Sequence, residues 1–565
     1  MRHGSAHARR HRYIRNDFGE PVITFPSRRT QVHHYHGVRW NEPLITDLGC
    51  AGERGLLPAL PEPVVRRSGN ARRHLIRAAR TEAPLLPEIG QAQVLRHMLR
   101  LSQETLGSHL NVDIGQGTCT IKYNPKVNDD LANMAEVAKM HPLQPLSTVQ
   151  GLLQVFYELE QFLCKISGLD ACSLQPASGS AAIYTNIRMV QAYHRSRGED
   201  HRNIVITTSF SHPSNAATAR SAGYEVITIT SGPDGFPTVD NLRTVLDGRC
   251  AALMITNPED IGVFNPHISE MVDLVHEFGG LCIYDQANAN ALLGITRAAD
   301  AGFDACQFNL HKTFGAPHFA GGPASGACLV TEKLEPFLPS PVIVRRADSF
   351  ELDNNRPMSI GKVRPFYGVT GQIVRAYCWI LALGDEGLEQ VTQGAVLANN
   401  YLMGELLQVP GVTAPLAPRG HRLEQVRFSL QGLAEQTGVG SADLAVRMAD
   451  FGFHYWTSHH PYVVPEPATF EPTESYSRTE LDQFVDAFRT VAAEAMNDSE
   501  TVLSAPHRVA ISRIRDGVMD EPDTWAPSMR AYRAKYLAEV RLETSRWKPF
   551  AGMPMPHRNA KAAHR

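Results

Sequence analysis

A chain of 565 residues is too long for a single hydrophobic core, so we expect two or more domains. Hydrophobic residues make up 43% of the sequence, as in a globular protein, and the formal net charge of -3 argues against nucleic acid as a general partner. No apolar run is long enough to span a bilayer, and the first residues lack the hydrophobic segment of a secretory signal. The nine cysteines show no CxxC spacing, which indicates reduced thiols rather than a disulfide framework or a metal site. We therefore expect a cytoplasmic protein without a metal.

The first 150 residues fall into two parts by composition. Residues 1–38 are rich in Arg and His without a clear period, which favours a solvated, flexible extension over an arm that binds nucleic acid or an acidic partner. Residues 39–150 form an N-terminal segment, which is irregular up to residue 63 and has a helix predicted over residues 95–106. Pro125 ends regular structure, so Lys122 and Tyr123 are expected on an ordered loop. Such a loop can be mere packing, but its amine, phenol and hydroxyl groups also suit a polar substrate pocket.

Strands and helices alternate in the next part of the chain, residues 151–370. Apolar residues over 152–166 share one helical face, and Gly168 ends that helix. Short apolar strands are predicted beyond it, with helical patterns near 182–197, 212–223, 239–247 and 267–278 between most of them; the strands span residues 204–207, 225–229, 251–256, 281–285, 305–308 and 327–331. This alternation predicts an α/β fold with a mainly parallel sheet that is covered on both faces, and ligands at the carboxyl ends of its strands.

Longer helices replace this alternation from about residue 371. Helices are predicted over 372–383 and 398–407, and a smaller α+β domain follows to residue 505, with strands at 425–430 and 462–464 and a helix over 478–495. Residues 506–565 form a basic tail, in which a helical pattern over 527–540 is expected to pack on a neighbouring part of the protein.

A lysine and a carboxylate stand out in the predicted sheet domain. Lys312 ends an apolar stretch, beside His311, and precedes a glycine-rich loop, a setting poorly suited to a core. Desolvation lowers the pKa of an amine, so a partly buried lysine can attack a carbonyl and hold it as a Schiff base. Asp285 ends another apolar strand, where an acid is often only a cap or a turn residue. Together the two are the fixtures that pyridoxal 5'-phosphate (PLP) requires, namely an amine for its aldehyde and an acid for its pyridine nitrogen.

Other motifs could complete a PLP site. A small-residue turn that includes Ser178, Gly179 and Ser180 opens a helix, where free amides and the positive dipole end favour a phosphate; plain helix capping would look the same. His212 opens the next helix, either as a cap residue or as an imidazole stacked on an aromatic cofactor. Thr256 follows a buried strand, where its hydroxyl would meet the ring oxygen of the cofactor.

The order of these motifs resembles a known family, the glycine dehydrogenase (decarboxylating) P-protein of the glycine cleavage system, in particular subunit 2 of the two-subunit bacterial form. The matching stretches lie between about residues 40 and 510 and read TCTIKYNP (118–125), LQPASG (174–179), LMITNP (253–258), YDQANAN (284–290), NLHKTF (309–314) and EPTES (471–475). The resemblance implies a fold-type-I PLP enzyme, with a large sheet domain, a smaller C-terminal domain and sites near a subunit interface.

The resemblance also implies residue roles. Lys312 would hold the cofactor aldehyde, Asp285 would pair with the pyridine nitrogen, and Thr256 would lie near the ring oxygen. His212 would stack on one ring face and Ala287 would pack against the other.

Further roles concern the phosphate and the substrate. Ser178, Gly179 and Ser180, with His311, would hold the phosphate. Lys122 and Tyr123 lie in a motif that the family uses to line its site.

Three positions depart from the family pattern. Ala181 and Ile183 replace a histidine and a glutamate beside the expected phosphate seat, and a bulky Phe319 interrupts a glycine-rich run. Because the loss of a buried polar partner alters recognition more than the loss of a methylene, these changes could redirect substrate choice or outcome. Alternatively, a second subunit supplies the missing polar groups.

The leading expectation is an enzyme that decarboxylates a small amino acid, glycine by resemblance, and transfers the aminomethyl group to a lipoyl carrier protein. It would work as a homodimer or, with a subunit-1-like partner, as a heterotetramer, without nucleic acid or membrane partners. The alternatives are a diverged PLP enzyme (a decarboxylase, transaminase or aldol-type enzyme) acting on another amino acid, and a non-catalytic partner subunit. The retention of Lys312 and Asp285 argues against the last.

Overall fold

The computed structural model describes most of the chain between residues 35 and 510. The described residues are 13–15, 21–23, 32, 35–40, 42–53, 55, 62–64, 86–106, 112–115, 122–318, 322–416, 420–455, 463–510 and 513. The predicted helix over 527–540, most of the basic tail and Phe319 lie outside them. Within this described part of the chain, no helix has the length and apolarity needed to cross a membrane.

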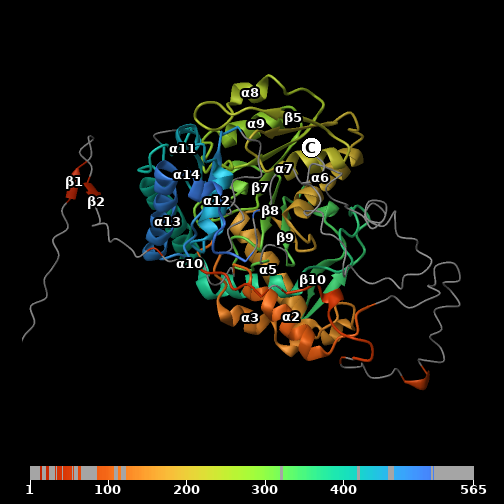
Figure 1. Cartoon of the computed structure of the whole chain (residues 1–565). Helices are drawn as coiled ribbons and strands as arrows, with labels where there is room; N and C mark the ends of the chain where they lie inside the picture. The colour runs from red at the N-terminus through yellow and green to blue at the C-terminus, as the bar shows by residue number, and fades with distance from the viewer. Residues whose placement is uncertain are drawn as a thin grey trace, which may run out of the picture.

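A seven-stranded sheet forms the centre of the larger part of the molecule (Figure 1). In sheet order its strands are β3 (Ala171–Ser173), β9 (Gly326–Val330), β8 (Ala305–Asn309), β7 (Leu281–Gln286), β6 (Cys250–Thr256), β4 (Ile204–Thr208) and β5 (Glu225–Ile229). The strands from β8 to β5 pair in parallel, and β9 runs against both of its neighbours. The predicted α/β fold with a mainly parallel sheet is therefore confirmed.

Helices cover both faces of this sheet. One face carries α6 (Gly179–Ser196) and α7 (Pro213–Ser221), whose buried side chains join those of the strands in one apolar cluster. The other face packs against a larger cluster that includes residues of α5 (Gln150–Ser167), α8 (Val239–Arg243) and α9 (Ile268–Glu277). Coverage on both faces explains why the strands are nearly continuous apolar runs rather than alternating ones.

The C-terminal part is a smaller α+β assembly with a core of its own. A two-stranded antiparallel pair, β12 (Val426–Ser429) and β13 (Pro467–Phe470), lies under four helices, which are α11 (Gln431–Thr437), α12 (Ser441–Ala449), α13 (Arg478–Asn497) and α14 (Ser499–Leu503). Ser477 and Glu480 form a capping box that begins α13, because each satisfies a backbone amide that the first helical turn leaves unpaired.

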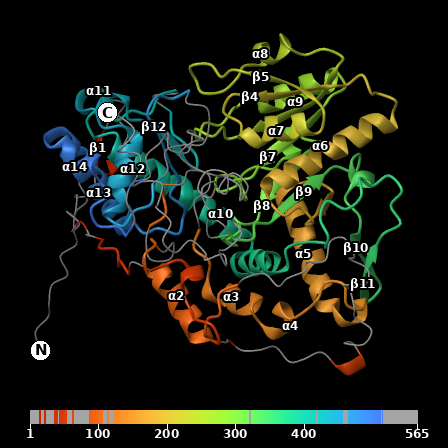
Figure 2. The ribbon, with the colours of Figure 1, turned by 45° about the vertical axis from the view of Figure 1, so that its right-hand side comes forward.

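One long helix, α10 (Thr370–Leu406), belongs to both cores and runs between them in Figure 2. Its first half buries Ile373 and Trp379 against the sheet region, and its last turns bury Leu402 and Leu406 in the C-terminal core. The helix is interrupted at Gly384, whose φ of 64° and ψ of −171° are not helical. Only glycine adopts such angles without a steric penalty.

The remaining elements are short. The N-terminal segment carries α2 (Gln91–Gln103), α3 (Lys126–Ala132) and α4 (Ala135–Ala138), and two hairpins pair β1 (Tyr13–Arg15) with β2 (Pro21–Ile23) and β10 (Val342–Arg346) with β11 (Ser349–Asp353). In the described part of the chain, 3-10 turns span Ile45–Asp47, Leu146–Thr148, Ala299–Ala301 and Glu335–Phe337.

The structure corrects some of the predicted elements. The strand predicted over 462–464 is wrong for its two described residues, because Val463 is exposed and Pro465 lacks a backbone donor; the strand forms later, as β13. The predicted helix over 372–383 is confirmed as the part of α10 before Gly384, and the helix predicted over 398–407 is confirmed within the part after it, which begins earlier than predicted. The strands β3, β10 and β11 were not predicted.

Candidate functional site

Lys312 lies in a tight turn that directly follows β8. Its amide donates a hydrogen bond of 3.1 Å to the carbonyl oxygen of Asn309, the last residue of the strand. Leu310 and Phe314 are fully buried on either side, so the turn is anchored by its apolar neighbours. The lysine side chain is 6% exposed. A buried amine on a fixed turn is suited to covalent attachment of a carbonyl compound.

Asp285 lies near the carboxyl end of the adjacent strand, β7, with 2% of its surface exposed. Its Oδ1 accepts hydrogen bonds from the side-chain amide of Gln307 and from the backbone amide of Ala287, the latter at 3.0 Å. Burial raises the pKa of Asp285, while these two hydrogen bonds and the charge of Lys312 act to lower it. The carboxylate is thus held in a fixed orientation at the edge where a parallel sheet presents its ligand site.

Five of the predicted residues line one pocket. Lys312 and Asp285 share it with His212, Thr256 and Ala287. The pocket lies at the carboxyl ends of β6, β7 and β8 and is closed from the other side by residues before β12. The structure therefore brings together side chains that the sequence placed on four separate segments.

Each of the other two polar residues is fixed by a local hydrogen bond. His212 is the N-cap of α7, and its Nδ1 accepts a bond of 3.1 Å from the amide of Ser214. The amide of Thr256 donates to Ser211 Oγ at 3.2 Å, whereas its own hydroxyl is buried and bonds to none of the residues that the structure describes. A buried hydroxyl without a partner is a natural contact for a bound ligand.

The start of α6 lies close to the end of β8. A Cβ at Gly179 would clash with the side-chain amide of Asn309, so a larger residue here requires Asn309 to move. Ser178 is the N-cap, and its Oγ accepts a bond of 3.1 Å from the amide of Ala181. Ser180 is exposed in the first turn. These three residues do not line the pocket of Lys312, but the helix end borders the strand that leads to it.

His311 is buried beside Lys312. Its Nδ1 lies 2.9 Å from the carbonyl oxygen of Ser325 and 3.2 Å from the amide of the same residue. Burial and the neighbouring Lys312 lower the pKa of His311 to about 3, so the ring is neutral near pH 7. It could therefore give a phosphate a hydrogen bond but not a positive charge.

Lys122 and Tyr123 point in opposite directions. Lys122 is 3% exposed; its Nζ lies 3.0 Å from Glu474 Oε1 and 4.8 Å from the centre of the Trp379 ring. Tyr123 is 60% exposed and is tied only through its amide, which donates to Ser475 Oγ at 3.0 Å. Of the two residues, only Lys122 therefore lies in the protein interior.

The C-terminal part adds groups that the sequence did not single out. Glu424 and Gln425 line the pocket, as do Asp260 and Asn288. Glu471 is fully buried and accepts hydrogen bonds from the side-chain amides of Asn288 and Asn290. The sequence signal that could have identified Glu424 is its position directly before an apolar strand, because an acid buried there needs a polar partner or a ligand.

Ile183, one of the departures from the family pattern, does not face this pocket. Its side chain is fully buried in the apolar cluster between α6 and the sheet. An apolar residue is what that position requires in this chain, so Ile183 supports packing of the helix.

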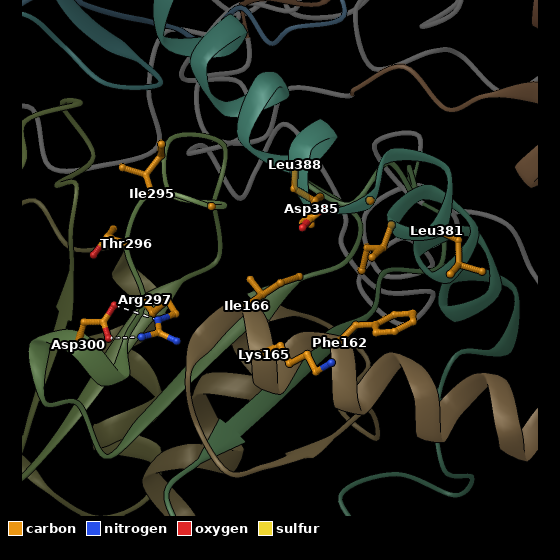
Figure 3. A pocket seen from close by; sticks show the side chains of 13 residues that line it. Phe162, Lys165, Ile166, Ile295, Thr296, Arg297, Asp300, Leu381, Asp385 and Leu388 are labelled. Carbon is orange, nitrogen blue, oxygen red and sulfur yellow. Dashed lines mark hydrogen bonds and ion pairs between the residues drawn. The ribbon is translucent and has the colours of Figure 1, made fainter.

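A second hollow, of about 450 Å³, lies between α5, the segment around residues 294–300 and the bend of α10 (Figure 3). Its walls are largely apolar, including Phe162, Ile166 and Leu388, and the ion pair of Arg297 with Asp300 lies at its edge. None of the predicted site residues lines it.

Known proteins resemble the chain over most of its length. The family model for the C-terminal domain of glycine dehydrogenase matches residues 391–509. A probable glycine dehydrogenase (decarboxylating) subunit 2 of Halalkalibacterium halodurans is 43% identical over 77% of this chain and 88% of its own. One of Pyrococcus horikoshii is 39% identical, over 85% of this chain and 95% of its own.

The chain belongs to the glycine dehydrogenase (decarboxylating) subunit 2 family. A crystal structure of a glycine decarboxylase (P-protein) of the glycine cleavage system, in inhibitor-bound form, has the same fold. It superimposes with a TM-score of 0.65 over 77% of this chain and 99% of its own, at 21% identity. The predicted family and the fold-type-I architecture are confirmed.

Proposed function

We propose that this chain is the PLP-dependent subunit of a glycine dehydrogenase, which decarboxylates glycine and passes the aminomethyl group to a lipoylated carrier protein. The names of its relatives support this assignment. The observation that carries it is the convergence of Lys312 and Asp285, with His212, Thr256 and Ala287, on one pocket. None of the described residues that line this pocket favours one of the alternative PLP reactions over this one.

The residues of the pocket fit PLP. Lys312 offers the buried amine for its aldehyde, and Asp285 offers an oriented carboxylate for its pyridine nitrogen. The hydroxyl of Thr256, which bonds to no described residue, would satisfy the ring oxygen. His212 and the small Ala287 would lie on the two faces of the ring. When bound, PLP supplies a protonated ring that accepts the electron pair left on an amino acid as its carboxylate departs.

The phosphate would lie at the start of α6. Gly179 permits the helix end to approach β8, and the exposed Ser180 and the N-cap Ser178 carry hydroxyl groups there. The first turn of an α-helix presents unpaired amides and the positive end of the helix dipole. His311 would add one uncharged donor.

The protein contributes orientation and exclusion of water. The loop after β7 is held by hydrogen bonds from Asn288 and Asn290 to Glu471 and from the amide of Ala289 to Thr313 Oγ1, at 2.9 Å. This loop carries Ala287, so the position of the ring depends on a residue of the C-terminal part. The buried Lys122 is paired with Glu474 and acts electrostatically on Glu471, and we expect it to bound the substrate space.

The name subunit 2 supports a multi-subunit assembly with a subunit-1 partner. We propose that the active enzyme contains that partner. Either it or the chain itself supplies the polar groups lost at Ala181.

A carboxyl-label experiment tests this function. Purified protein, loaded with PLP, is incubated with carboxyl-labelled glycine and a panel of other amino acids, with and without lipoylated carrier protein and subunit 1. We expect release of labelled CO2 from glycine that depends on the carrier. Faster turnover of another amino acid, or release that ignores the carrier, would contradict the proposed reaction and point to a role for Ala181 or Phe319 in a different outcome.

A further inference from the structure

Glu424 is an acid inside the pocket that the roles above leave unused. It precedes β12 in the C-terminal part and is 2% exposed. Its side chain lines the same pocket as Lys312, Asp285 and Thr256. Oε1 accepts a hydrogen bond of 3.2 Å from Gln425 Nε2, while Oε2 is buried and bonds to none of the residues that the structure describes.

The surroundings of Glu424 disfavour a negative charge. Glu471, at the end of β13, and Asp260, on the segment after β6, both repel it. Asp285 shares its pocket, together with the cationic Lys312 and with His212. A negative charge on Glu424 would also act on Tyr284 of β7, where it raises the pKa of the phenol. Because like charges and burial both favour the neutral form, the carboxyl group keeps its proton in this setting.

Glu424, with its unpaired Oε2, and Thr256, with its unpaired hydroxyl, line the same pocket. Both are groups that donate a hydrogen bond, and both come from elements that close the pocket from different sides. A ligand oxygen that accepts hydrogen bonds can satisfy both groups, and an anionic oxygen makes the stronger bond.

We propose that Glu424 is a neutral acid that donates a hydrogen bond to an anionic oxygen of the ligand bound in this pocket. This inference rests on the proposed function, which offers two such oxygens, the ring oxygen of PLP and the carboxylate of the amino acid. A protonated carboxyl group can fill this role because its O–H donates a hydrogen bond. When the group ionises, it loses that donor and gains a charge that repels the anionic oxygen.

The direction of titration agrees with this role. Burial, followed by repulsion from Glu471, raises the pKa of Glu424 to about 8. The donor is therefore present near neutral pH and is lost as the pH rises through that value.

The variants Glu424→Gln and Glu424→Ala test the proposal in the full chain. Gln keeps a donor but cannot ionise, whereas Ala removes it. Glu435→Gln, an exposed residue of α11, is the matched control. For each protein the affinity for PLP, and then for glycine, is measured from pH 6.5 to 9.5 by the absorbance of the cofactor.

We expect wild-type affinity to fall about tenfold for each pH unit above 8, because one proton must be retained. Glu424→Gln should stay within a few-fold of wild type at pH 7 and lose this dependence, and Glu424→Ala should bind at least tenfold more weakly at pH 7. A pH effect on PLP itself assigns the ring oxygen as the acceptor, and an effect on glycine alone assigns its carboxylate.

Two failures are distinguishable. If wild-type protein gives no borohydride-fixed PLP on Lys312, the proposed function and this inference both fall. If the cofactor is fixed there but Glu424→Gln keeps the wild-type pH dependence, or binds as weakly as Glu424→Ala, the inference alone is wrong. The Gln variant decides the question even if the Ala variant does not fold.

Discussion

Lys312 lies in the turn that follows β8 and Asp285 near the end of the adjacent β7, and hydrogen bonds hold the backbone of the first and the carboxylate of the second. Reduction with borohydride in the presence of PLP should therefore attach the cofactor to Lys312 and to no other lysine. Peptide mapping by mass spectrometry identifies the labelled residue. Lys333→Ala, which removes a half-exposed partner of Asp304, should label as wild type does, whereas Lys312→Ala should not label. A label on Lys122 would reverse the roles of the two buried lysines.

Asp285→Asn separates binding from chemistry. The amide still accepts a hydrogen bond from Ala287 but carries no charge to keep a pyridine nitrogen protonated. We expect near-normal PLP occupancy and a rate lowered on the order of 100-fold or more. Cofactor absorbance and turnover are measured on the same sample. A variant that turns over at the wild-type rate would make Asp285 a structural cap.

Glu160 gives the stability of the fold a pH dependence. This residue of α5 is 8% exposed, and burial raises the pKa of its carboxyl well above the ordinary value, against a hydrogen bond from the backbone of Leu174. Because the pKa of Glu160 is higher in the folded state, its contribution to stability is fully present below the pKa of the unfolded state. That contribution declines as the pH rises toward the pKa of the folded state. Wild-type melting temperature should thus fall from pH 5 to pH 8, and that of Glu160→Gln should fall less. Parallel melting curves for the two proteins would contradict this.

At the level of single elements, the start of α6 lies close to the end of β8 because residue 179 is a glycine. Gly179→Ala would place a methyl group against the side-chain amide of the buried Asn309, so either this side chain or the helix end must shift. We expect a loss of about 1–3 kcal/mol in the free energy of unfolding and weaker binding of PLP. Gly404→Ala in α10, where a Cβ would have nothing within 4 Å, is the control and should be neutral or stabilising. Denaturant unfolding measures the stability of the two variants, and titration with PLP measures their affinity for the cofactor. An unchanged PLP affinity in Gly179→Ala would contradict a phosphate site at this helix end.

The elements of the sheet region could be predicted because burial on both faces leaves a simple pattern of apolar strands. Lys312 and Asp285 could be found for the same reason, since a polar residue that ends such a strand is conspicuous. Glu424 could not be assigned, because it reaches the pocket from another core. Glu471 begins the stretch EPTES, but the sequence does not indicate that it binds Asn288 and Asn290 of the loop after β7. Ile183 was interpreted as a change at the phosphate seat, but the helical turn directs it into the core instead.

At the level of the whole molecule, the C-terminal core is completed by a segment from the N-terminal side. Val112 and Ile114 are buried in that core, the amide of Glu471 donates to the carbonyl oxygen of Ile114 at 3.0 Å, and Gly115 bridges to Tyr455. Ile114→Ala should therefore cost about 2–4 kcal/mol, although it lies far in sequence from the elements that it stabilises. Val127→Ala, at a position 56% exposed, should change little.

Limited proteolysis, followed over time by mass spectrometry, locates the effect of Ile114→Ala. Cleavage within residues 391–509 should accelerate, and cleavage in the sheet region should not. Equal acceleration in both regions would mean that the two cores unfold as one unit.

The bend at Gly384 has a mechanical consequence. The amine and the carboxylate of the pocket are carried by one core, the two glutamates by the other, and a single helix is embedded in both. Hydrogen bonds from Asn288 and Asn290 to Glu471 and from the amide of Leu423 to Gly262 join the two cores beside the pocket, and the bend of α10 is a further covalent link between them. Any other residue at position 384 would strain the backbone angles of the bend, although an added Cβ would meet no atom within 4 Å, so Gly384→Ala would test the angle between the two halves of α10 without a steric clash.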